Sequence, residues 1–408
     1  MSKITVLDQA TINKIAAGEV VERPSSVVKE LVENAIDANA TAITVEIKEG
    51  GISFIRVTDN GAGMEKEDVA TAFLRHATSK IKSALDLLLV GSLGFRGEAL
   101  SSICAVSQVE LLTKTKNDFI GTRYVIEGGE EKILEEVGCP SGTTFLVRNL
   151  FYNTPARKKF LKSAVTEGGH INELLERLAL SRPEISFKYM NNGKTILHTT
   201  GNRDIKEIIY YIYGKDIASS VIPIPNTNDD AEIKLTGYIG KPVIAKGNRS
   251  HENYFVNGRY VKCNIITRAI EDAYQSYMMG HKYPFTVIHI TVPPDFIDVN
   301  VHPTKMELRF SNQQAVYDFV YQGLRKVLTY NTIRNTLSGK NMIVPVSFSE
   351  KEDKKVQQQQ LYQRQKTYIP EPFEVRRKEQ TVPIVQETIS TYQATKPIIS
   401  ETISSATK

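Results

Sequence analysis

The 408-residue sequence has no apolar run of transmembrane length and no signal-peptide core at its N-terminus, which predicts a cytoplasmic protein. Only three cysteines are present, Cys104, Cys139 and Cys263, and they are far apart with no CxxC spacing. This pattern argues against a disulfide framework and against a structural zinc site. The seven histidines form neither an HExxH nor an HxxxH pair.

Neither sign of charge is in large excess. The formal net charge of +5 is mildly basic, and it permits nucleic-acid binding without requiring it. Hydrophobic residues make up 41% of the chain and charged residues 24%, as in ordinary globular proteins. The length predicts two or three domains.

Three regions differ in pattern. Residues 1–210 mix helices with a mainly antiparallel sheet, and an early short helix is predicted to end at Gly18. Residues 215–332 form a second α+β unit, in which Asn257-Gly258 is a strong hairpin signal. Residues 345–408 are rich in Gln, Thr, Ser and charge. They have too little apolar surface to offset their chain entropy, which predicts a disordered linker or tail.

A helix over residues 27–38 organises the first region. Its apolar stripe follows the i, i+3, i+4, i+7 spacing of a buried face and consists of Val28, Leu31, Val32 and Ala35. Its opposite face carries Glu30, Glu33, Asn34 and Asp37. This polar face is either merely solvated or part of a site. In a site, Glu30 suits a general base, and Asn34 suits a neutral oxygen ligand for Mg²⁺.

A second polar motif follows a predicted strand and reads Asp59-Asn60-Gly61-Ala62-Gly63. A carboxylate at a strand end is placed to accept a hydrogen bond from an exocyclic amine, and the glycines let the backbone approach a ligand. An ordinary type I turn accounts for the motif equally well.

A third motif is a glycine-bracketed loop that opens a helix at residues 94–100. Backbone N–H groups at such a place form an anion site, although an ordinary loop is the alternative. The loop is neither a Walker A motif nor a Rossmann fingerprint. Upstream, Thr78, Ser79 and Lys80 offer hydroxyls and an ammonium group, or simply a solvated helix end. By themselves, Lys305 is an exposed lysine, and His76 and His302 are structural histidines.

The order of these motifs resembles the GHKL ATPases, and five longer stretches are similar to the MutL mismatch-repair family within that superfamily. These stretches are IAAGEVVERP at residues 15–24, RHATSK at 75–80, GFRGEAL at 94–100, FYNTPAR at 151–157 and VNVHPTK at 299–305. The resemblance covers about residues 1–330.

The resemblance implies a role for each motif. Glu30 is the implied base, Asn34 the Mg²⁺ ligand, and Asp59 the group that reads the adenine amine. Lys305, from the second domain, is implied to reach the γ-phosphate. The remaining nucleotide-binding positions are Gly61, Gly63, Thr143, the lid residues Thr78, Ser79 and Lys80, and the lid loop Gly94, Phe95, Arg96, Gly97 and Glu98.

The implied fold is an α/β sandwich of the GHKL (Bergerat) type in residues 1–210. A transducer domain similar to ribosomal protein S-five follows in residues 215–332. The implied activity is slow, Mg²⁺-dependent ATP hydrolysis. ATP binding is implied to close a lid and to dimerise the chain, and this switch is implied to couple mismatch recognition to strand removal. The implied partners are DNA, a mismatch sensor of the MutS type, and a downstream helicase or nuclease.

The DNA assignment starts from basic residues of the second unit, namely Arg249, Arg259, Lys262, Arg268 and Lys282. Their phosphate contacts would be sequence-independent and salt-sensitive, whereas a solvated basic surface is the alternative. One basic position often used by relatives is Asn264 here. The DQHAxxE motif of a nicking site is absent, which predicts an N-terminal portion without endonuclease chemistry.

Three other functions stay open. The chain is a nucleotide-gated binding module if its hydrolysis is incidental, although Glu30 favours hydrolysis. A topoisomerase ATPase fragment shares Glu30 and Asp59 but does not account for residues 94–100 or 151–157. A sensor histidine kinase is disfavoured because no phosphoacceptor helix pair precedes the site.

Overall fold

The computed structural model describes residues 6–80, 97–225, 233–293, 296–298 and 309–337. All of them lie in the first of two units, residues 1–345, into which the chain divides. The predicted tail at 345–408 lies outside the described residues.

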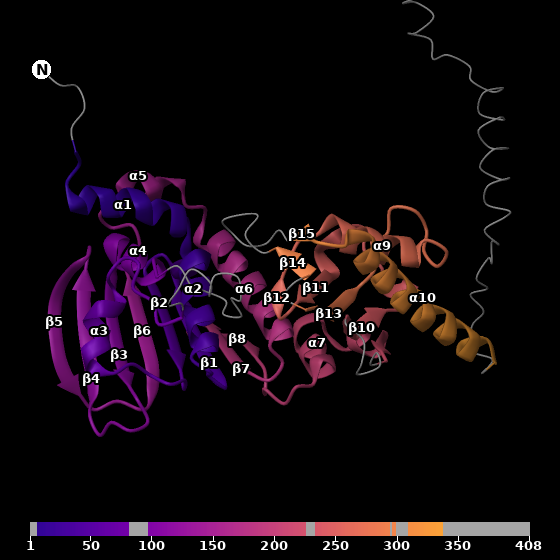
Figure 1. Cartoon of the computed structure of the whole chain (residues 1–408), viewed down its shortest axis with the longest axis horizontal. Coiled ribbons are helices and arrows are strands. Elements are labelled where there is room, and N and C mark those ends of the chain that lie inside the picture. Colours follow the sequence, from indigo (N-terminus) through magenta and orange to yellow (C-terminus); the bar gives the residue numbers. More distant parts are fainter. Residues whose placement is uncertain (1–5, 81–96, 226–232, 294–295, 299–308, 338–408) are drawn as a thin grey trace, which may run out of the picture. The chain divides into compact units, whose positions relative to one another are not determined.

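The first sheet has eight strands in the order β5-β4-β3-β6-β2-β1-β7-β8 (Figure 1). The strands are β1 Ala42–Lys48, β2 Phe54–Asp59, β3 Gln108–Lys114, β4 Gly121–Glu127, β5 Glu130–Val137, β6 Gly142–Arg148, β7 Ser186–Asn191 and β8 Lys194–His198. Only β1 and β7 pair in parallel, and every other neighbouring pair in this sheet is antiparallel. The predicted mixture of helices with a mainly antiparallel sheet is confirmed.

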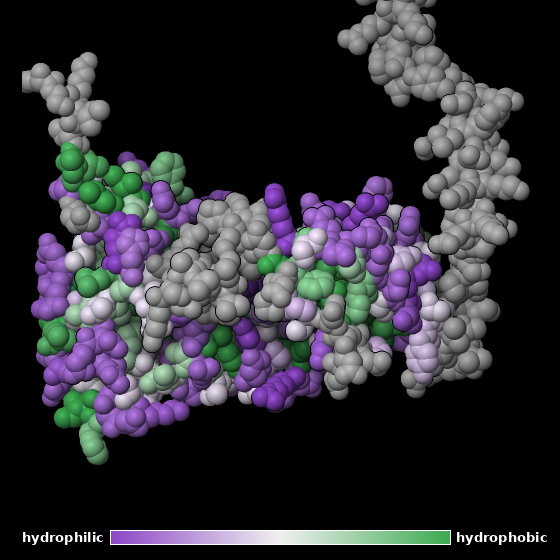
Figure 2. Space-filling model, in the orientation of Figure 1, coloured by the Kyte–Doolittle hydropathy of each residue, from purple (hydrophilic) through white to green (hydrophobic). Residues whose placement is uncertain are grey.

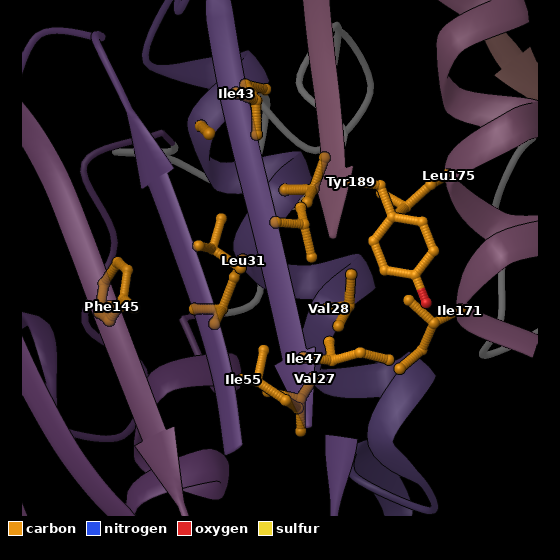
Figure 3. Packing of buried hydrophobic residues seen from close by; sticks show 14 of the residues in the cluster. Val27, Val28, Leu31, Ile43, Ile47, Ile55, Phe145, Ile171, Leu175 and Tyr189 are labelled. Atoms are coloured by element: carbon orange, nitrogen blue, oxygen red, sulfur yellow. The ribbon is translucent and has the colours of Figure 1, made fainter. Parts of the chain in front are cut away.

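Helices cover one face of this sheet. Those that contact its strands include α2 Pro24–Asp37, α3 Lys66–Ala72, α4 Ala99–Val106 and α6 Ala164–Ser181. Helix α1 Gln9–Val20 packs on α4, and α5 Pro155–Phe160 is bonded to α1. The short 3-10 turn η1 lies at Glu49–Gly51. Figure 3 shows side chains of α2 and α6 packed against those of β1, β2, β6 and β7. The other face carries charged pairs instead, such as Glu46 with Arg56 and Glu110 with Arg123. One face of the sheet is therefore apolar and covered, and the other is polar and faces solvent, as in a two-layer sandwich.

Helix α2 forms as its sequence predicts. Pro24 occupies the first turn, where its missing N–H costs nothing. The four apolar residues of the stripe are all buried, together with Val27. Asn39, just beyond the helix, has φ of 58°, the left-handed conformation that ends a helix. The polar face of α2 is therefore held at a fixed angle to the sheet.

One helix end was predicted wrongly. Helix α1 does not stop at Gly18 but runs on to Val20. A Cβ atom at Gly18 would lie 1.8 Å from Nη2 of Arg157, and that guanidinium donates a hydrogen bond to the carbonyl oxygen of Ile15 at 3.2 Å. Gly18 is thus a packing glycine inside the helix, where it makes room for an arginine from α5.

The second sheet has the order β12-β11-β13-β10-β9. Its strands are β9 Val221–Ile224, β10 Lys234–Gly240, β11 Glu252–Val256, β12 Arg259–Tyr260 and β13 Thr286–Thr291. The remaining elements are helices α7 Ile205–Tyr213, α8 Lys215–Ser219, α9 Asn264–Tyr274 and α10 Gln313–Leu337, turns η3 Pro242–Ile244 and η4 Arg249–His251, and the pair β14 Ile297–Asp298 and β15 Arg309–Phe310.

The predicted hairpin is confirmed. Asn257 and Gly258 both have positive φ, 48° and 74°, and they join β11 to β12 with Val256 opposite Arg259. This is the pattern of the turn that favours Asn-Gly. Helices α9 and α10 pack together beside this sheet over a second apolar cluster.

The apolar stripe of α2 predicts a stability test. Leu31 is 1% exposed, so Leu31→Ala should lower the free energy of unfolding by about 2–5 kcal/mol through lost burial and a residual cavity. Leu74 is 61% exposed, and the matched control Leu74→Ala should change it by less than about 0.5 kcal/mol. Urea titration measures both values, and equal effects would contradict the burial of this face.

Candidate functional site

The polar face of α2 is an ordered ion-pair network. The Lys29 ammonium lies 3.2 Å from both Glu30 Oε1 and Glu33 Oε2. Burial lowers the pKa of Lys29, but Glu33 and Glu30 outweigh it and leave the pKa above its ordinary value. The side chain of Glu30 is 25% exposed. Glu30 is therefore fixed by a neighbour and still accessible from outside.

The segment after α3 reaches the same face one turn further along. The Lys80 ammonium donates to Asn34 Oδ1 at 3.0 Å and lies 2.5 Å from Asp37 Oδ2. The backbone N–H of Lys80 donates to Thr78 Oγ1 at 3.2 Å. These bonds place the Lys80 side chain against Asn34 and the Thr78 hydroxyl against the Lys80 backbone, while Ser79 is exposed.

The start of α4 is tied to this segment. The N–H of His76 donates to the carbonyl oxygen of Gly97 at 2.8 Å, and His76 Nδ1 lies 3.4 Å from Glu98 Oε1. Gly97 has φ of +61°, and a Cβ there would lie 2.5 Å from the carbonyl oxygen of Ala77. Two stretches separated in sequence therefore meet at a position that only glycine fits.

Asp59 lies at the end of β2, on the helical side of the sheet. It continues the buried alternation of Ile55 and Val57 and is itself 8% exposed. Its Oδ1 accepts from the N–H of Gly61 at 2.8 Å. Burial raises the pKa of Asp59 above its ordinary value, and hydrogen bonds from the backbone of Gly61 and Thr143 oppose the shift.

Two threonines lie beside Asp59 at the same end of the sheet. Thr113 and Thr143 lie at the ends of β3 and β6, and their hydroxyl oxygens are 3.1 Å apart. Thr113 Oγ1 also accepts from the N–H of Met64 at 3.0 Å. Gly63, with φ of +77°, leaves no room for a Cβ, which would lie 2.2 Å from the carbonyl oxygen of Lys114. The Asp59 loop is thus held against three strand ends.

Most of the candidate positions therefore fall into two clusters. Asn34, Thr78 and Lys80 meet at the end of α2, with Glu30 one turn away. Asp59 and Thr143 lie opposite each other at the ends of the neighbouring strands β2 and β6. The N–H of Ala62 donates to the carbonyl oxygen of Ala38 at 3.0 Å, which joins this end of the sheet to the end of α2. Gly94, Phe95, Arg96 and Lys305 lie outside the described residues.

The sequence interpretation gave no role to Lys29, Asp37 or Thr113. Asp37 was on the polar face, but its lysine partner is distant in the sequence. Thr113 had a visible signal, since it ends the buried alternation of Val109 and Leu111 with a hydroxyl. When neighbouring strands of a sheet each end a buried apolar alternation with a polar residue, those polar residues lie close together at the same end of the strands.

The oxygen atoms on α2 suit a hard cation. Asn34 Oδ1 and Asp37 Oδ2 both accept the ammonium of Lys80, so their lone pairs converge on one positive group. Mg²⁺ is commonly held by one or two protein oxygens together with phosphates and water, and Asn34 fits that limited role. Within the described ranges, no group of three or more His, Cys, Asp or Glu side chains could hold a metal by itself.

Comparisons with known proteins agree with this geometry. The family model described as "Histidine kinase-, DNA gyrase B-, and HSP90-like ATPase" matches residues 22–132. The model described as "DNA mismatch repair protein, C-terminal domain" matches residues 209–329. The first region is therefore a GHKL-type ATPase domain, and the fold class predicted from the sequence is confirmed.

The relatives define the family. DNA mismatch repair protein MutL of Agathobacter rectalis is 59% identical over 379 residues, which are 92% of this chain and 56% of the relative. MutL of Clostridium botulinum is 50% identical over 79% of this chain and 48% of the relative. The chain belongs to the MutL family of DNA mismatch repair proteins. It spans about half the length of these curated relatives.

Solved structures of related proteins share this fold. The N-terminal domain of a DNA repair protein superposes with a TM-score of 0.67 at 26% identity and covers 79% of this chain and 99% of that one. The Aquifex aeolicus MutL ATPase domain in complex with ADP superposes with a TM-score of 0.53 at 26% identity, over 74% and 98% of the two chains. In the described part of the chain, no helix is both long and apolar enough to cross a membrane.

The buried carboxylate of Asp59 predicts a pH effect. Because its pKa in the folded protein is raised above 3.8, stability falls as the pH rises through the window above that value. Asp59→Asn keeps an acceptor oxygen and removes the charge, so it should raise the free energy of unfolding at pH 7. This advantage should shrink below pH 4.

Urea unfolding at the two pH values measures this, and exposed Asp68 supplies the control Asp68→Asn, with little expected change. A lower stability of Asp59→Asn at pH 7 would show that the two backbone hydrogen bonds outweigh the burial cost.

Proposed function

We propose that this chain is a Mg²⁺-dependent ATPase that uses ATP as a slow conformational switch in DNA mismatch repair. The observation that carries the proposal is the polar face of α2, where accessible Glu30 and Lys80-bound Asn34 lie one turn apart. The ADP complex of the Aquifex aeolicus relative supports nucleotide binding by this fold.

Glu30 is assigned the general-base role. It would accept a proton from the water that attacks the γ-phosphorus, and the bond from phosphorus to the bridging oxygen would break to give ADP and phosphate. Lys29 holds one oxygen of Glu30 at 3.2 Å and so orients the carboxylate. Phosphoryl transfer depends mainly on such positioning and on charge neutralisation.

Asn34 would hold Mg²⁺, which neutralises phosphate charge when bound. Asp59 would accept from the adenine amine, with Thr143, Gly61 and Gly63 around the base. The buried position of Asp59 strengthens such a hydrogen bond, because water competes poorly there.

The lid would consist of Thr78, Ser79 and Lys80 with the loop from Gly94 to Glu98. The hydrogen bond from the N–H of His76 to the carbonyl oxygen of Gly97 supports this grouping, because it links the two segments. Lys80 would move from its carboxylate partner to the triphosphate, which offers more negative charge. Lys305 is assigned the γ-phosphate contact, so that the second domain responds to the presence of that phosphate.

The proposed domain division is an ATPase domain at 1–210, a transducer domain at 215–332 and a linker or tail at 345–408. Dimerisation on ATP binding is proposed to use the end near α1 and α5. Exposed apolar side chains gather there, including Leu7, Ile15 and Phe160, at 49%, 54% and 86% exposure (Figure 2). Contiguous exposed apolar patches are typical of surfaces that bind another protein.

DNA binding is proposed for the second domain. Among its basic residues, Lys262, Arg268 and Lys282 are exposed and suit sequence-independent phosphate contacts. Arg249 instead donates to Glu271 Oε2 at 3.1 Å and stacks on Tyr283. Coupling a mismatch sensor of the MutS type to a helicase or nuclease is the proposed role of the switch.

The base assignment predicts a separation of binding from turnover. Glu30→Ala should still bind ATP, because the carboxylate repels phosphate rather than holding it, while turnover falls at least roughly a hundredfold. Steady-state phosphate release measures turnover, and calorimetry with Mg²⁺·ATP measures binding. Exposed Glu22, in the turn before α2, supplies the control Glu22→Ala, with unchanged turnover expected.

Unchanged turnover in Glu30→Ala would contradict the assignment. A wild-type chain that binds ATP without releasing phosphate above the rate of Glu30→Ala would instead identify a nucleotide-gated binding module.

A further inference from the structure

Thr113 is the most deeply buried of three polar side chains that lie in a row at one end of the first sheet. It is 1% exposed, whereas Thr143 is 6% and Asp59 is 8% exposed. Thr143 pairs with Asp59 on one side and with Thr113 on the other, and residues paired directly across strands share a face of the sheet. The proposed function uses Asp59 and Thr143. It leaves Thr113, which is too deeply buried to touch a ligand, without a role.

The hydroxyl of Thr113 has three polar neighbours. It accepts a hydrogen bond from the N–H of Met64 at 3.0 Å and donates one to the carbonyl oxygen of Gly142 at 3.1 Å. Its third neighbour is Oγ1 of Thr143, also at 3.1 Å. A hydroxyl group has one hydrogen to donate and two lone pairs with which to accept, so three partners use its full capacity.

This capacity fixes the direction of the bond between the two threonines. The carbonyl of Gly142 can only accept, so it takes the hydrogen of Thr113, and the N–H of Met64 takes one lone pair. All three contacts are hydrogen bonds at once only if Thr143 donates its own hydrogen to the second lone pair of Thr113. The hydrogen is assigned here from the network of partners. Thr143 then presents lone pairs, and no hydrogen, on its other side, toward Asp59.

The exposed side of this row therefore consists of acceptors. The carboxylate of Asp59 is an acceptor through both of its oxygens, and the hydroxyl of Thr143 becomes one as well, because its hydrogen is turned toward Thr113. Such a surface fits a donor with two hydrogens, such as the exocyclic amine of adenine. It repels the carbonyl oxygen that a 6-oxopurine carries at the same position of the ring.

The backbone around the row is held in place without the hydroxyl of Thr113. Gly142 has φ of +113°, and a Cβ there would lie 2.2 Å from the carbonyl oxygen of Asp59. Strands β3 and β6 pair along the whole of Gln108–Lys114. Loss of the hydroxyl should therefore leave Asp59 and Thr143 in place and free the hydrogen of Thr143 to turn.

We propose that Thr113 is a positioning residue for nucleobase selection, which holds the hydroxyl of Thr143 as an acceptor so that the site takes an adenine nucleotide and rejects a 6-oxopurine nucleotide. This inference rests on the proposed ATPase function. It deepens that function by naming the class of base that the site selects and a residue that sets the choice from behind the groups facing the ligand.

The test is calorimetric binding of ADP and IDP, each with Mg²⁺, to the whole chain. IDP carries a carbonyl oxygen at C6 and a hydrogen on N1 in place of the amine of ADP, and neither ligand has a γ-phosphate to be hydrolysed. Wild type should prefer ADP by at least about a hundredfold, because the analogue leaves buried polar groups unpaired. Thr113→Val should reduce this preference by about tenfold, since Thr143 can then donate to the C6 carbonyl.

Two controls separate hydrogen placement from packing. Thr113→Ser keeps the hydroxyl and should hold the preference within about threefold of wild type. Thr144 and Thr58 form a second threonine pair between β6 and β2, with hydroxyl oxygens 3.1 Å apart. This pair lies on the opposite face of the sheet, because successive residues of a strand alternate. Thr144→Val removes the same group from the same strand and should leave the preference unchanged.

A purely structural role for Thr113 predicts a different pattern. A loosened site would bind ADP and IDP more weakly by similar factors, and their ratio would stay that of wild type. Urea unfolding shows whether each variant is folded. If Thr113→Val does not fold, Thr113→Cys takes its place, because a thiol is a weak donor and a weak acceptor, and its preference for ADP should fall by at least about threefold.

Each outcome separates the two proposals. If wild type binds ADP and IDP alike, if Thr113→Val keeps the preference for ADP, or if Thr144→Val lowers it as much, the role of Thr113 is wrong and the ATPase proposal stands. If folded wild type binds neither diphosphate, the ATPase proposal itself is overturned, and the role of Thr113 with it.

Discussion

The division of α2 into two faces is the constraint on which the rest depends. Val28, Leu31 and their neighbours must pack on the sheet to be removed from water. Since a helix has a fixed 3.6-residue period, this burial turns Glu30 and Asn34 outward together. The apolar core is thus what presents the candidate base and the candidate metal ligand at one turn's separation.

Charge is the second constraint. Lys29 and Lys80 bridge the carboxylates of α2 to one another and to the segment after α3. Asp59, in contrast, is a buried carboxylate at the end of β2 that no lysine among the described residues balances in this way. Burial raises its pKa, so its ionisation costs stability. A costly charge held by backbone N–H groups is typical of a site arranged for a ligand rather than for stability. The proposed roles use both features.

Local signals were predicted well, and distant contacts were not. The stripe of α2 and the Asn-Gly hairpin follow from short-range geometry, so the sequence predicts them. Gly18 was misread because its reason is Arg157, which lies far along the chain. Strand β5 has no buried side chain and therefore shows no alternation from which the sequence could predict it. The placement of Lys80 on Asp37 likewise depends on tertiary folding.

The central claim is that the polar face of α2 binds nucleotide through a metal ion at Asn34. Titration of a non-hydrolysable ATP analogue into wild type and Asn34→Ala, each with Mg²⁺ and with EDTA, tests it most directly. The account predicts one site in wild type that Mg²⁺ strengthens by at least about tenfold, and little effect of Mg²⁺ on Asn34→Ala. The same Mg²⁺ dependence in both proteins, or no binding by wild type, would contradict it.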